Sequence, residues 1–323
     1  MKEAGAAARG RKKFYMLVGL PGSGKTTYAK EMLAAAEAEG RKIAWISSDR
    51  IRGELYGSQE EQGNPVRVFE QMRLRTVKAL SDGWDVIYDA CNINSKRRKV
   101  FLAGLRRFDC EKICLIAATP YALCLERNAK RSRKVPEEAI ERMYTTWWTP
   151  APFEGWDRIR LLYAPGSEGL FGDPEAFAEK YIAYDQMNPH HLESLGEHVR
   201  RAGEYLREKG VDGNSNLIIA AMLHDCGKPF TRFVETRENG RKVAHYYRHE
   251  NVGAYDALFY DLKGRGKTEQ DILEISLLIG LHMTPFSWKK TDGRDKKREL
   301  WGDALYEKIE LLNEADLAAK TEE

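Results

Sequence analysis

The sequence predicts an α/β domain built on a parallel sheet over residues 1–170, followed by an all-helical domain over residues 171–323. In the first part, apolar runs typical of buried strands alternate with helical patterns, as in open parallel sheets. The stretch "GSEGLFGDP" at 166–174 is rich in turn formers and marks the predicted boundary. Beyond it, apolar residues recur at helical spacing.

Composition places the chain among ordinary globular proteins. Its 323 residues suffice for two domains, with 42% hydrophobic and 31% charged side chains. No apolar run reaches the roughly 18–20 residues of a membrane span, and the first residues lack the apolar core of an export signal. We therefore expect a cytoplasmic protein with reduced cysteines and no membrane partner.

Charge and histidine divide the chain at the same place. Residues 1–170 hold 30 Lys/Arg against 21 Asp/Glu, whereas all seven histidines lie at or beyond position 190. A basic surface attracts phosphate-rich partners such as nucleic acid, although a modest excess is also common without one. Imidazole is a frequent metal ligand and proton carrier. The two parts are expected to carry different chemistry.

The first predicted element is a strand, which is followed by a glycine-rich turn and a helix ending near Gly40. The turn has the pattern G-x-x-x-x-G-K-T from Gly19 to Thr26, whose backbone N–H groups close around phosphates at a helix N-terminus. Lys25 reaches the terminal phosphates and the Thr26 hydroxyl ligates Mg²⁺. ATP or another NTP with Mg²⁺ is the predicted cofactor. The predicted nucleotide-binding residues are Gly19, Pro21, Gly22, Ser23, Gly24, Lys25, Thr26, Thr27 and Arg127.

Two further strands end in polar residues. "KIAWISSDR" brings Asp49 to the carboxyl end of a strand, where open sheets bind ligands, with Arg52 one helical turn away. A carboxylate there can accept the proton of an attacking hydroxyl, and the arginine can hold an acceptor phosphate. The alternative for Asp49 is a helix N-cap. "WDVIYDACN" ends in Asp89 and Asn92, which suit magnesium-water or substrate contacts.

A cationic segment follows in "ERNAKRSRKVPEEAIERMY". It predicts a lid whose Arg131 and Arg133 close on the triphosphate and offset transition-state charge, ahead of a helix opened by Pro136. The alternative to a lid is that these charged residues form a solvent-exposed face without a catalytic role. The aromatic residues of "TTWWTPAPFEGWDRIRLL" can either stack on bases or pack in the core.

These pieces together resemble the phage-type polynucleotide kinases and their P-loop relatives. "GLPGSGKTT", "SSDRIR", "YDACN" and "RNAKRSRKVP" stand in family order over about 130 residues. The resemblance implies an α/β P-loop NTPase that transfers the γ-phosphate of ATP to a 5′-hydroxyl of RNA or DNA. It makes Asp49 the general base, Arg52 the ligand of the acceptor 3′-phosphate, and Arg131 and Arg133 the lid arginines.

The second part repeats one feature, a histidine or aspartate carried by a helix of the predicted core. The helix "NLIIAAML" is apolar on every side yet runs directly into His224 and Asp225, which are costly to bury unpaired. "HLESLGEHVRRAGEYLREKG" carries His198 near an apolar stripe of Leu192, Leu195, Val199, Ala202 and Leu206. The other such residues are His249, which opens a helix, His282 and Asp316.

Several inward imidazoles and carboxylates are hard to satisfy without an ion, although a single histidine is usually a satisfied core residue. The set suits Mn, Fe, Ni, Co or Zn. The order of these residues, with "LHDCGKP", "RHENVGA", "LIGLHM" and "EADLAAK", resembles the HD phosphohydrolase superfamily, above all the HD domains of tRNA nucleotidyltransferases.

That resemblance assigns roles residue by residue. It makes His198, His224, Asp225 and Asp316 the core metal ligands, adds His249 and His282 as ligands of a second ion, and gives Asp225 the bridging position. Lys228 would neutralise substrate phosphate, and His191 and His245 are candidates for phosphate contact. His190 is expected in a loop.

A kinase for 5′-hydroxyl ends joined to a phosphohydrolase resembles the bacterial enzymes that heal RNA ends, although here the kinase comes first. This implies a second activity on 2′,3′-cyclic phosphates and on 2′- or 3′-phosphates. The expected partners are RNA or DNA ends, including tRNA, and a separate RNA ligase. Two alternatives remain: a nucleoside or nucleotide kinase fused to an HD nucleotidase, and a kinase with a non-catalytic HD module that binds tRNA.

Overall fold

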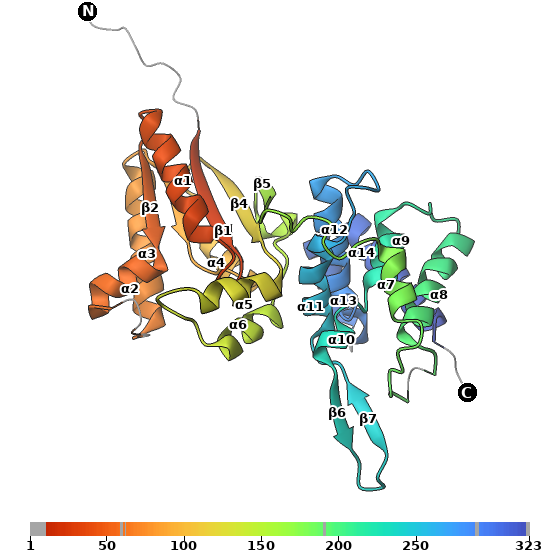
Figure 1. Cartoon of the computed structure of the whole chain (residues 1–323). Coiled ribbons are helices and arrows are strands. Elements are labelled where there is room, and N and C mark those ends of the chain that lie inside the picture. The colour runs from red at the N-terminus through yellow and green to blue at the C-terminus, as the bar shows by residue number, and fades with distance from the viewer. Residues whose placement is uncertain (1–10, 59–60, 62, 190–191, 288–290, 321–323) are drawn as a thin grey trace, which may run out of the picture.

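The computed structural model describes residues 11–58, 61, 63–189, 192–287 and 291–320. Figure 1 shows a sheet with its covering helices beside a second body made mostly of helices, and a two-stranded hairpin that projects from that second body. No helix of the described residues is long and apolar enough to cross a membrane.

The sheet is parallel throughout, in the order β2-β3-β1-β4-β5. Its strands are β1 (Lys12–Val18), β2 (Ile43–Ser47), β3 (Asp85–Asp89), β4 (Cys110–Ala118) and β5 (Arg158–Tyr163). The predicted strands before Gly19, Asp49 and Asn92 are therefore confirmed. Because β1 is central, the loop that follows it opens in the middle of the carboxyl edge of the sheet.

Crossover helices connect the strands, as parallel pairing requires. They are α1 (Lys25–Ala38), α2 (Ser48–Tyr56), α3 (Pro65–Ser81), α4 (Ser95–Gly104), α5 (Tyr121–Ala129), α6 (Glu137–Tyr144) and the 3₁₀ turn η1 (Pro152–Glu154). Ser47 is the N-cap residue of α2 and Asp49 lies in its first turn, so the N-cap alternative for Asp49 is wrong.

Helices dominate the second half. They are α7 (Pro174–Lys180), α8 (Leu195–Glu208), α9 (Asn216–Leu223), α10 (Lys228–Thr231), α11 (His249–Asp256), α12 (Glu269–Leu281), α13 (Thr291–Trp301) and α14 (Asp303–Ala318), with 3₁₀ turns η2 (Ala257–Phe259) and η3 (Pro285–Ser287).

Two predictions for the second half need correction. It is not all-helical, because β6 (Phe233–Thr236) and β7 (Lys242–His245) pair as an antiparallel hairpin. Leu192 was predicted on the buried stripe of α8, yet it lies ahead of the Ser194 N-cap and is exposed. The apolar spacing of a helix can extend in the sequence past the capping residue, although the helix itself stops there.

The two faces of the sheet pack against different cores because successive strand residues point to opposite sides. Leu17 faces a small core that includes Ala29 and Ala36 of α1. Phe14, Met16 and Val18 face a larger core that continues without interruption into the helices of the second half. Trp147 and Trp156 belong to this larger core, so core packing is the confirmed interpretation for these two aromatic residues.

Buried polar contacts join the two halves. The Tyr255 hydroxyl donates to the Thr119 carbonyl at 2.6 Å, and the Tyr144 hydroxyl donates to Asp256 at 2.7 Å. Tyr144, Tyr255 and Trp147 also stack edge to face across this junction. The junction is therefore as tightly packed as a domain interior, and it fixes one half relative to the other.

Candidate functional site

The phosphate loop adopts the conformation that its glycines permit. Gly22 and Gly24 have φ values of 85° and 92°, and a Cβ on Gly22 would approach the Cys124 carbonyl oxygen to 2.3 Å. No other residue fits at either position without strain. Lys25 curls back over the loop, where its Nζ donates to the carbonyls of Gly19 at 2.9 Å and Leu20 at 2.7 Å.

A carboxylate lies beside the first turn of α1. Asp89 Oδ2 accepts hydrogen bonds from the Thr26 hydroxyl at 3.2 Å and from Trp45 Nε1 at 3.3 Å. Burial raises the pKa of Asp89, and the nearby Lys25 ammonium opposes part of that rise. A hydroxyl and a carboxylate in contact form the oxygen pair that holds Mg²⁺ in P-loop enzymes. The residues present therefore fit the predicted magnesium ion.

Asp49 lies at the same edge of the sheet, held by two arginines. Its Oδ1 accepts a hydrogen bond from Arg52 at 2.6 Å and forms an ion pair with the predicted lid residue Arg133 at 2.9 Å, while about half of its side chain stays exposed. Arg127 lies beside the phosphate loop, since its Nη1 is 3.8 Å from the position of a Cβ on Gly24. Arg131 is exposed.

Asn92 is a structural residue as well as a predicted substrate ligand. It has a φ of 51°, and its amide group donates to the carbonyls of Leu17 at 2.7 Å and Ala90 at 3.2 Å. Because both bonds use Nδ2, only the side-chain carbonyl oxygen remains for a substrate. The structural role of Asn92 is to hold the loop after β3 against β1.

Two polar residues that sequence reasoning missed hold the kinase-like edge in shape. Arg98 is buried and forms a two-point ion pair with the equally buried Glu154 at 2.6 and 2.7 Å. Asn128 is buried, donates to the Val135 carbonyl at 2.8 Å and accepts from the Val135 N–H at 3.0 Å. It thus closes the arginine-bearing loop at its base. An asparagine inside a charged segment gives no sequence signal of this role.

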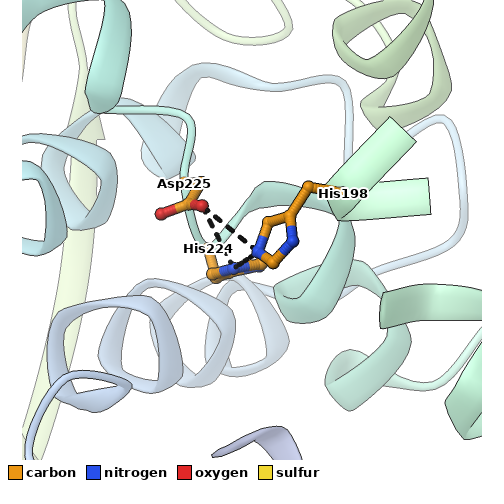
Figure 2. Close-up of side chains that lie close together, drawn as sticks. All are labelled: His198, His224 and Asp225. Atoms are coloured by element: carbon orange, nitrogen blue, oxygen red, sulfur yellow. Dashed lines mark hydrogen bonds and ion pairs between the residues drawn. The ribbon is translucent and has the colours of Figure 1, made fainter. Parts of the chain in front are cut away.

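The second group of predicted residues converges in the helical half. Figure 2 shows His198, His224 and Asp225 pointing toward one another. His198 Nε2 lies 3.2 Å from His224 Nε2, 3.5 Å from Asp225 Oδ2 and 3.1 Å from Asp316 Oδ1. All four side chains are buried, and they come from α8, the end of α9, the segment after it, and α14.

The other oxygen of Asp225 belongs to a second group. Asp225 Oδ1 lies 3.2 Å from His249 Nε2, which in turn lies 3.2 Å from His282 Nε2. His198, His224 and Asp225, and likewise Asp225, His249 and His282, each offer ligand atoms within 4.8 Å of one another. The Asp225 carboxylate therefore stands between two sets of donors, as a bridging ligand would.

The hydrogen bonding of three histidines fits metal ligation. The Nδ1 atoms of His224, His249 and His282 each lie 2.7 Å from the backbone carbonyl three residues earlier. A carbonyl only accepts, so each Nδ1 carries a hydrogen, and in its neutral form each imidazole presents an Nε2 lone pair to the cluster. Two lone pairs that face each other at 3.2 Å, as in His249 and His282, are satisfied by a cation or a proton between them.

The electrostatics of the cluster also fit metal ligation. Burial lowers the pKa of His224, but the carboxylates of Asp225 and Asp316 outweigh it and raise that pKa to about 10. Burial, together with the neighbouring His224 and His249, lowers the pKa of His282 to about 3. The carboxylates thus attract a proton to one imidazole where a metal ion would otherwise supply the positive charge.

Further residues surround the cluster, and sequence reasoning missed two of them. Glu193 is buried and its Oε1 lies 3.1 Å from His198 Nδ1, on the far side of the ring. Lys228 Nζ lies 2.7 Å from Asp225 Oδ2 and donates to Gln186 Oε1 at 2.7 Å. Glu193 and Gln186 occur in "YDQMNPHHLES", a stretch without a helical pattern that carries no signal of burial.

The remaining histidines do not join the cluster within the described residues. His245 lies on β7 with Nε2 3.2 Å from Glu235. The loop prediction for His190 and the phosphate-contact prediction for His191 fall outside the part of the chain that the structure describes.

The family model that matches this chain lies in the first half. Residues 14–147 match a family model described as an AAA domain. An L-seryl-tRNA(Sec) kinase of Methanococcus maripaludis is 26% identical over 142 residues, which cover 44% of this chain and 55% of that enzyme. The chain thus matches about half the length of this curated relative. With the observed phosphate loop and sheet, these matches show a P-loop kinase-type fold.

Solved structures give more distant similarities of fold. A chain of the Pnkp1/Rnl/Hen1 RNA repair complex is 18% identical with a TM-score of 0.36, over 45% of this chain and 46% of that chain. Chaetomium thermophilum Kti12, in complex with ADP-AlF3, is 20% identical with a TM-score of 0.38, over 49% of this chain and 92% of that chain. The phosphohydrolase prediction has no support from these matches and stays a prediction.

Proposed function

We propose that the protein heals nucleic-acid ends with two activities. The first half phosphorylates 5′-hydroxyl ends of RNA or DNA with ATP, and the second half hydrolyses 2′,3′-cyclic phosphate and 2′- or 3′-phosphate ends. The proposed domains are residues 1–170 and 171–323, and the change from sheet to helices supports this division. The observation that carries the two-activity proposal is the cluster around Asp225, whose two oxygens face separate sets of histidines.

In the kinase half, the loop from Gly19 to Thr27 holds the triphosphate, and Lys25 leaves its loop carbonyls to pair with the terminal phosphates. A magnesium ion held by Thr26 and Asp89 would neutralise phosphate charge. In the structure Arg133 forms an ion pair with Asp49. When Arg133 turns to the triphosphate, an oxygen of Asp49 becomes available to accept the proton of the attacking hydroxyl. Arg52 remains beside it to bind a phosphate of the acceptor strand.

The name of the curated relative is consistent with an RNA-linked acceptor. That relative is a kinase of L-seryl-tRNA(Sec), so its acceptor is carried on RNA. A polynucleotide acceptor for this chain agrees with the excess of Lys and Arg in residues 1–170. Arg127 and Arg131 then serve the nucleotide and the lid, as the family resemblance implies.

In the helical half, His198, His224, Asp225 and Asp316 would hold one ion, and Asp225, His249 and His282 a second. When bound there, a transition metal supplies Lewis acidity and makes water a better nucleophile near neutral pH. Glu193 orients the ring of His198, while backbone carbonyls orient His224, His249 and His282. Lys228 supplies a fixed positive charge beside Asp225 for the substrate phosphate.

A paired assay tests the proposal. The substrate is an RNA that carries a 5′-hydroxyl and a 2′,3′-cyclic phosphate, incubated with labelled ATP, Mg²⁺ and a transition metal. Lys25→Ala is expected to abolish 5′ labelling alone, because it removes a phosphate ligand, and Asp225→Ala to abolish 3′ processing alone.

Other outcomes contradict the proposal in distinguishable ways. Label that appears on free nucleosides but never on the RNA excludes a polynucleotide kinase. Bound metal without hydrolysis of the RNA end or of bis-p-nitrophenyl phosphate excludes the phosphohydrolase and leaves a binding module.

A further inference from the structure

The β6–β7 hairpin exposes aromatic rings on one face. Phe233 pairs directly with His245, so their side chains lie on the same face of the hairpin. The ring of Tyr247, two residues further on, stacks on that of His245 at 5.5 Å with an interplanar angle of 4°. Phe233 is 58% exposed and Tyr247 is 69% exposed. Single exposed aromatics are ordinary, but a contiguous set indicates a binding surface.

Cations lie along the hairpin that carries this aromatic face and at its root. Arg237, Arg241, Lys242 and Arg248 are exposed, and none of them forms an ion pair within the described part of the chain. The Glu235 carboxylate is engaged by His245. Between residues 232 and 248 the chain carries five Arg or Lys against two Glu. Rings that stack and cations that bind phosphate are the combination that holds single-stranded nucleic acid.

The hairpin leads directly into the histidine cluster. His249 opens α11 immediately after Tyr247 and Arg248, and its Nδ1 lies 2.7 Å from the Tyr246 carbonyl. Two residues span at most about 7 Å, so the backbone of Tyr247 lies within about 7 Å of the backbone of His249, which is about the length of one nucleotide. Arg248 has a φ of 65°, a left-handed conformation uncommon outside glycine, which is found preferentially at functional sites.

The root of the hairpin is fixed to the other half of the molecule. Phe230 in α10, which precedes β6, packs edge to face on Tyr121 at 5.4 Å and on Tyr144 at 4.9 Å. Those tyrosines belong to α5 and α6, which flank the arginine-bearing loop. The tip of the hairpin projects away from the helices, as Figure 1 shows. The aromatic face is therefore held in place at its base, where the rings of Phe233 and Tyr247 are exposed to solvent.

We propose that Phe233, His245 and Tyr247 form a stacking platform for the unpaired bases next to a 3′ end, and that Arg248 binds the phosphate between that platform and the histidine cluster. The occupant is a single nucleic-acid strand. Its identity as the strand being healed rests on the proposed function. The charge around the platform favours this occupant over an apolar protein partner or a second copy of the chain.

The test compares the double variant Phe233→Ala/Tyr247→Ala with Trp84→Ala in the full chain. Trp84 is an exposed aromatic residue just before β3, at the opposite edge of the sheet from the phosphate loop. Fluorescence anisotropy measures binding of a ten-nucleotide single-stranded RNA with a 3′-phosphate, and of a blunt duplex of the same sequence. Base stacking contributes about 1–3 kcal/mol per base, so the double variant is expected to bind the single strand at least tenfold more weakly.

Three further readouts make the result specific. Duplex binding and hydrolysis of bis-p-nitrophenyl phosphate are expected to stay unchanged, because neither needs unpaired bases. The conservative double variant Phe233→Tyr/Tyr247→Phe is expected to bind the strand as the unmodified protein does. If the double variant binds the single strand as tightly as Trp84→Ala does, the platform is excluded. It is also excluded if the unmodified protein is a dimer and the double variant is a monomer, because the aromatic face would then bind a second copy of the chain. Strand binding that depends on the platform, without any phosphoester hydrolysis, refutes the proposed function while the platform stands.

Discussion

Glu193 holds His198 from the side opposite the cluster. A carboxylate on the outer nitrogen of a ligating histidine fixes its tautomer and orientation and makes the other nitrogen a better donor. Glu193→Gln keeps the shape of the side chain but removes the charge. We expect it to weaken Mn²⁺ or Co²⁺ binding by about 10- to 100-fold, measured by competition with a fluorescent chelator.

The matched control is Glu204→Gln, which lies on the exposed face of α8. It is expected to leave metal affinity unchanged, and both variants are expected to keep full 5′ kinase activity. Equal metal affinity in the two variants would show that Glu193 does not support the cluster.

At the scale of elements, the loop between α5 and α6 carries the proposed lid arginines, and Asn128 closes this loop. Asn128→Ala removes both bonds to Val135 and frees the loop to move away from Asp49. Because small displacements of charge-stabilising groups are costly in phosphoryl transfer, we expect kcat/KM of the kinase to fall by about tenfold or more. Steady-state kinetics with varied ATP measure this change.

Lys130→Ala provides the comparison within the same loop, since Lys130 contacts only the exposed Glu126 in the described structure. It is expected to have little effect. Asn128→Asp, which keeps the acceptor and loses the donor, is expected to lie between the two. A kinase that tolerates Asn128→Ala as well as Lys130→Ala would exclude the proposed closure.

At the scale of the whole molecule, the buried Asp256 carboxyl at the junction makes stability depend on pH. Burial raises the pKa of Asp256 to about 7, although the hydrogen bond from Tyr144 opposes part of that rise. The unfolded carboxyl has a pKa near 3.9. Between those values the folded protein binds a proton that the unfolded chain does not, so stability falls as pH rises through this window and then levels off above it.

Asp256→Asn removes this titration and keeps an acceptor for Tyr144. We expect the stability of the variant relative to the unmodified protein to grow between pH 5 and pH 8 by on the order of 2 kcal/mol, because the unmodified protein loses stability over this window, and the carboxyl keeps some solvent contact, so the full shift is not realised. Urea unfolding at both pH values measures the difference. Cys226, Tyr255 and Tyr260 also face Asp256 and titrate well above this window. Parallel stability profiles for the two proteins would contradict the assignment, and Asp295→Asn on the exposed face of α13 serves as a control.

The junction also decides how the two proposed activities are arranged. A hydrogen bond from Thr119 Oγ1 to the Ser23 carbonyl of the phosphate loop at 3.0 Å is followed by the bond from Tyr255 to the Thr119 carbonyl. Tyr255 belongs to α11, the helix that His249 opens. The phosphate loop and the histidine cluster are thus joined through packed, hydrogen-bonded groups and not through a free linker.

Local sequence determined the elements and the identity of most candidate residues. The phosphate loop needs particular residues at fixed spacing, which the sequence shows directly. Strands and helices also have characteristic spacings or runs of apolar residues that can be seen in the sequence. For the same reason His224 and Asp225 were conspicuous at the end of a wholly apolar helix. Composition alone also offered core packing as one of the two interpretations of the aromatic run after the lid.

Tertiary structure alone decided what those residues contact. Glu193, Gln186, Asn128 and the Arg98–Glu154 pair acquire their roles from partners distant in the chain, and a sequence pattern describes only near neighbours. The β6–β7 hairpin was invisible because its strands are four residues long and mostly exposed. The shared core and the division of the Asp225 oxygens between two histidine groups arise only when helices from separate segments pack together, because burial is a property of the whole fold.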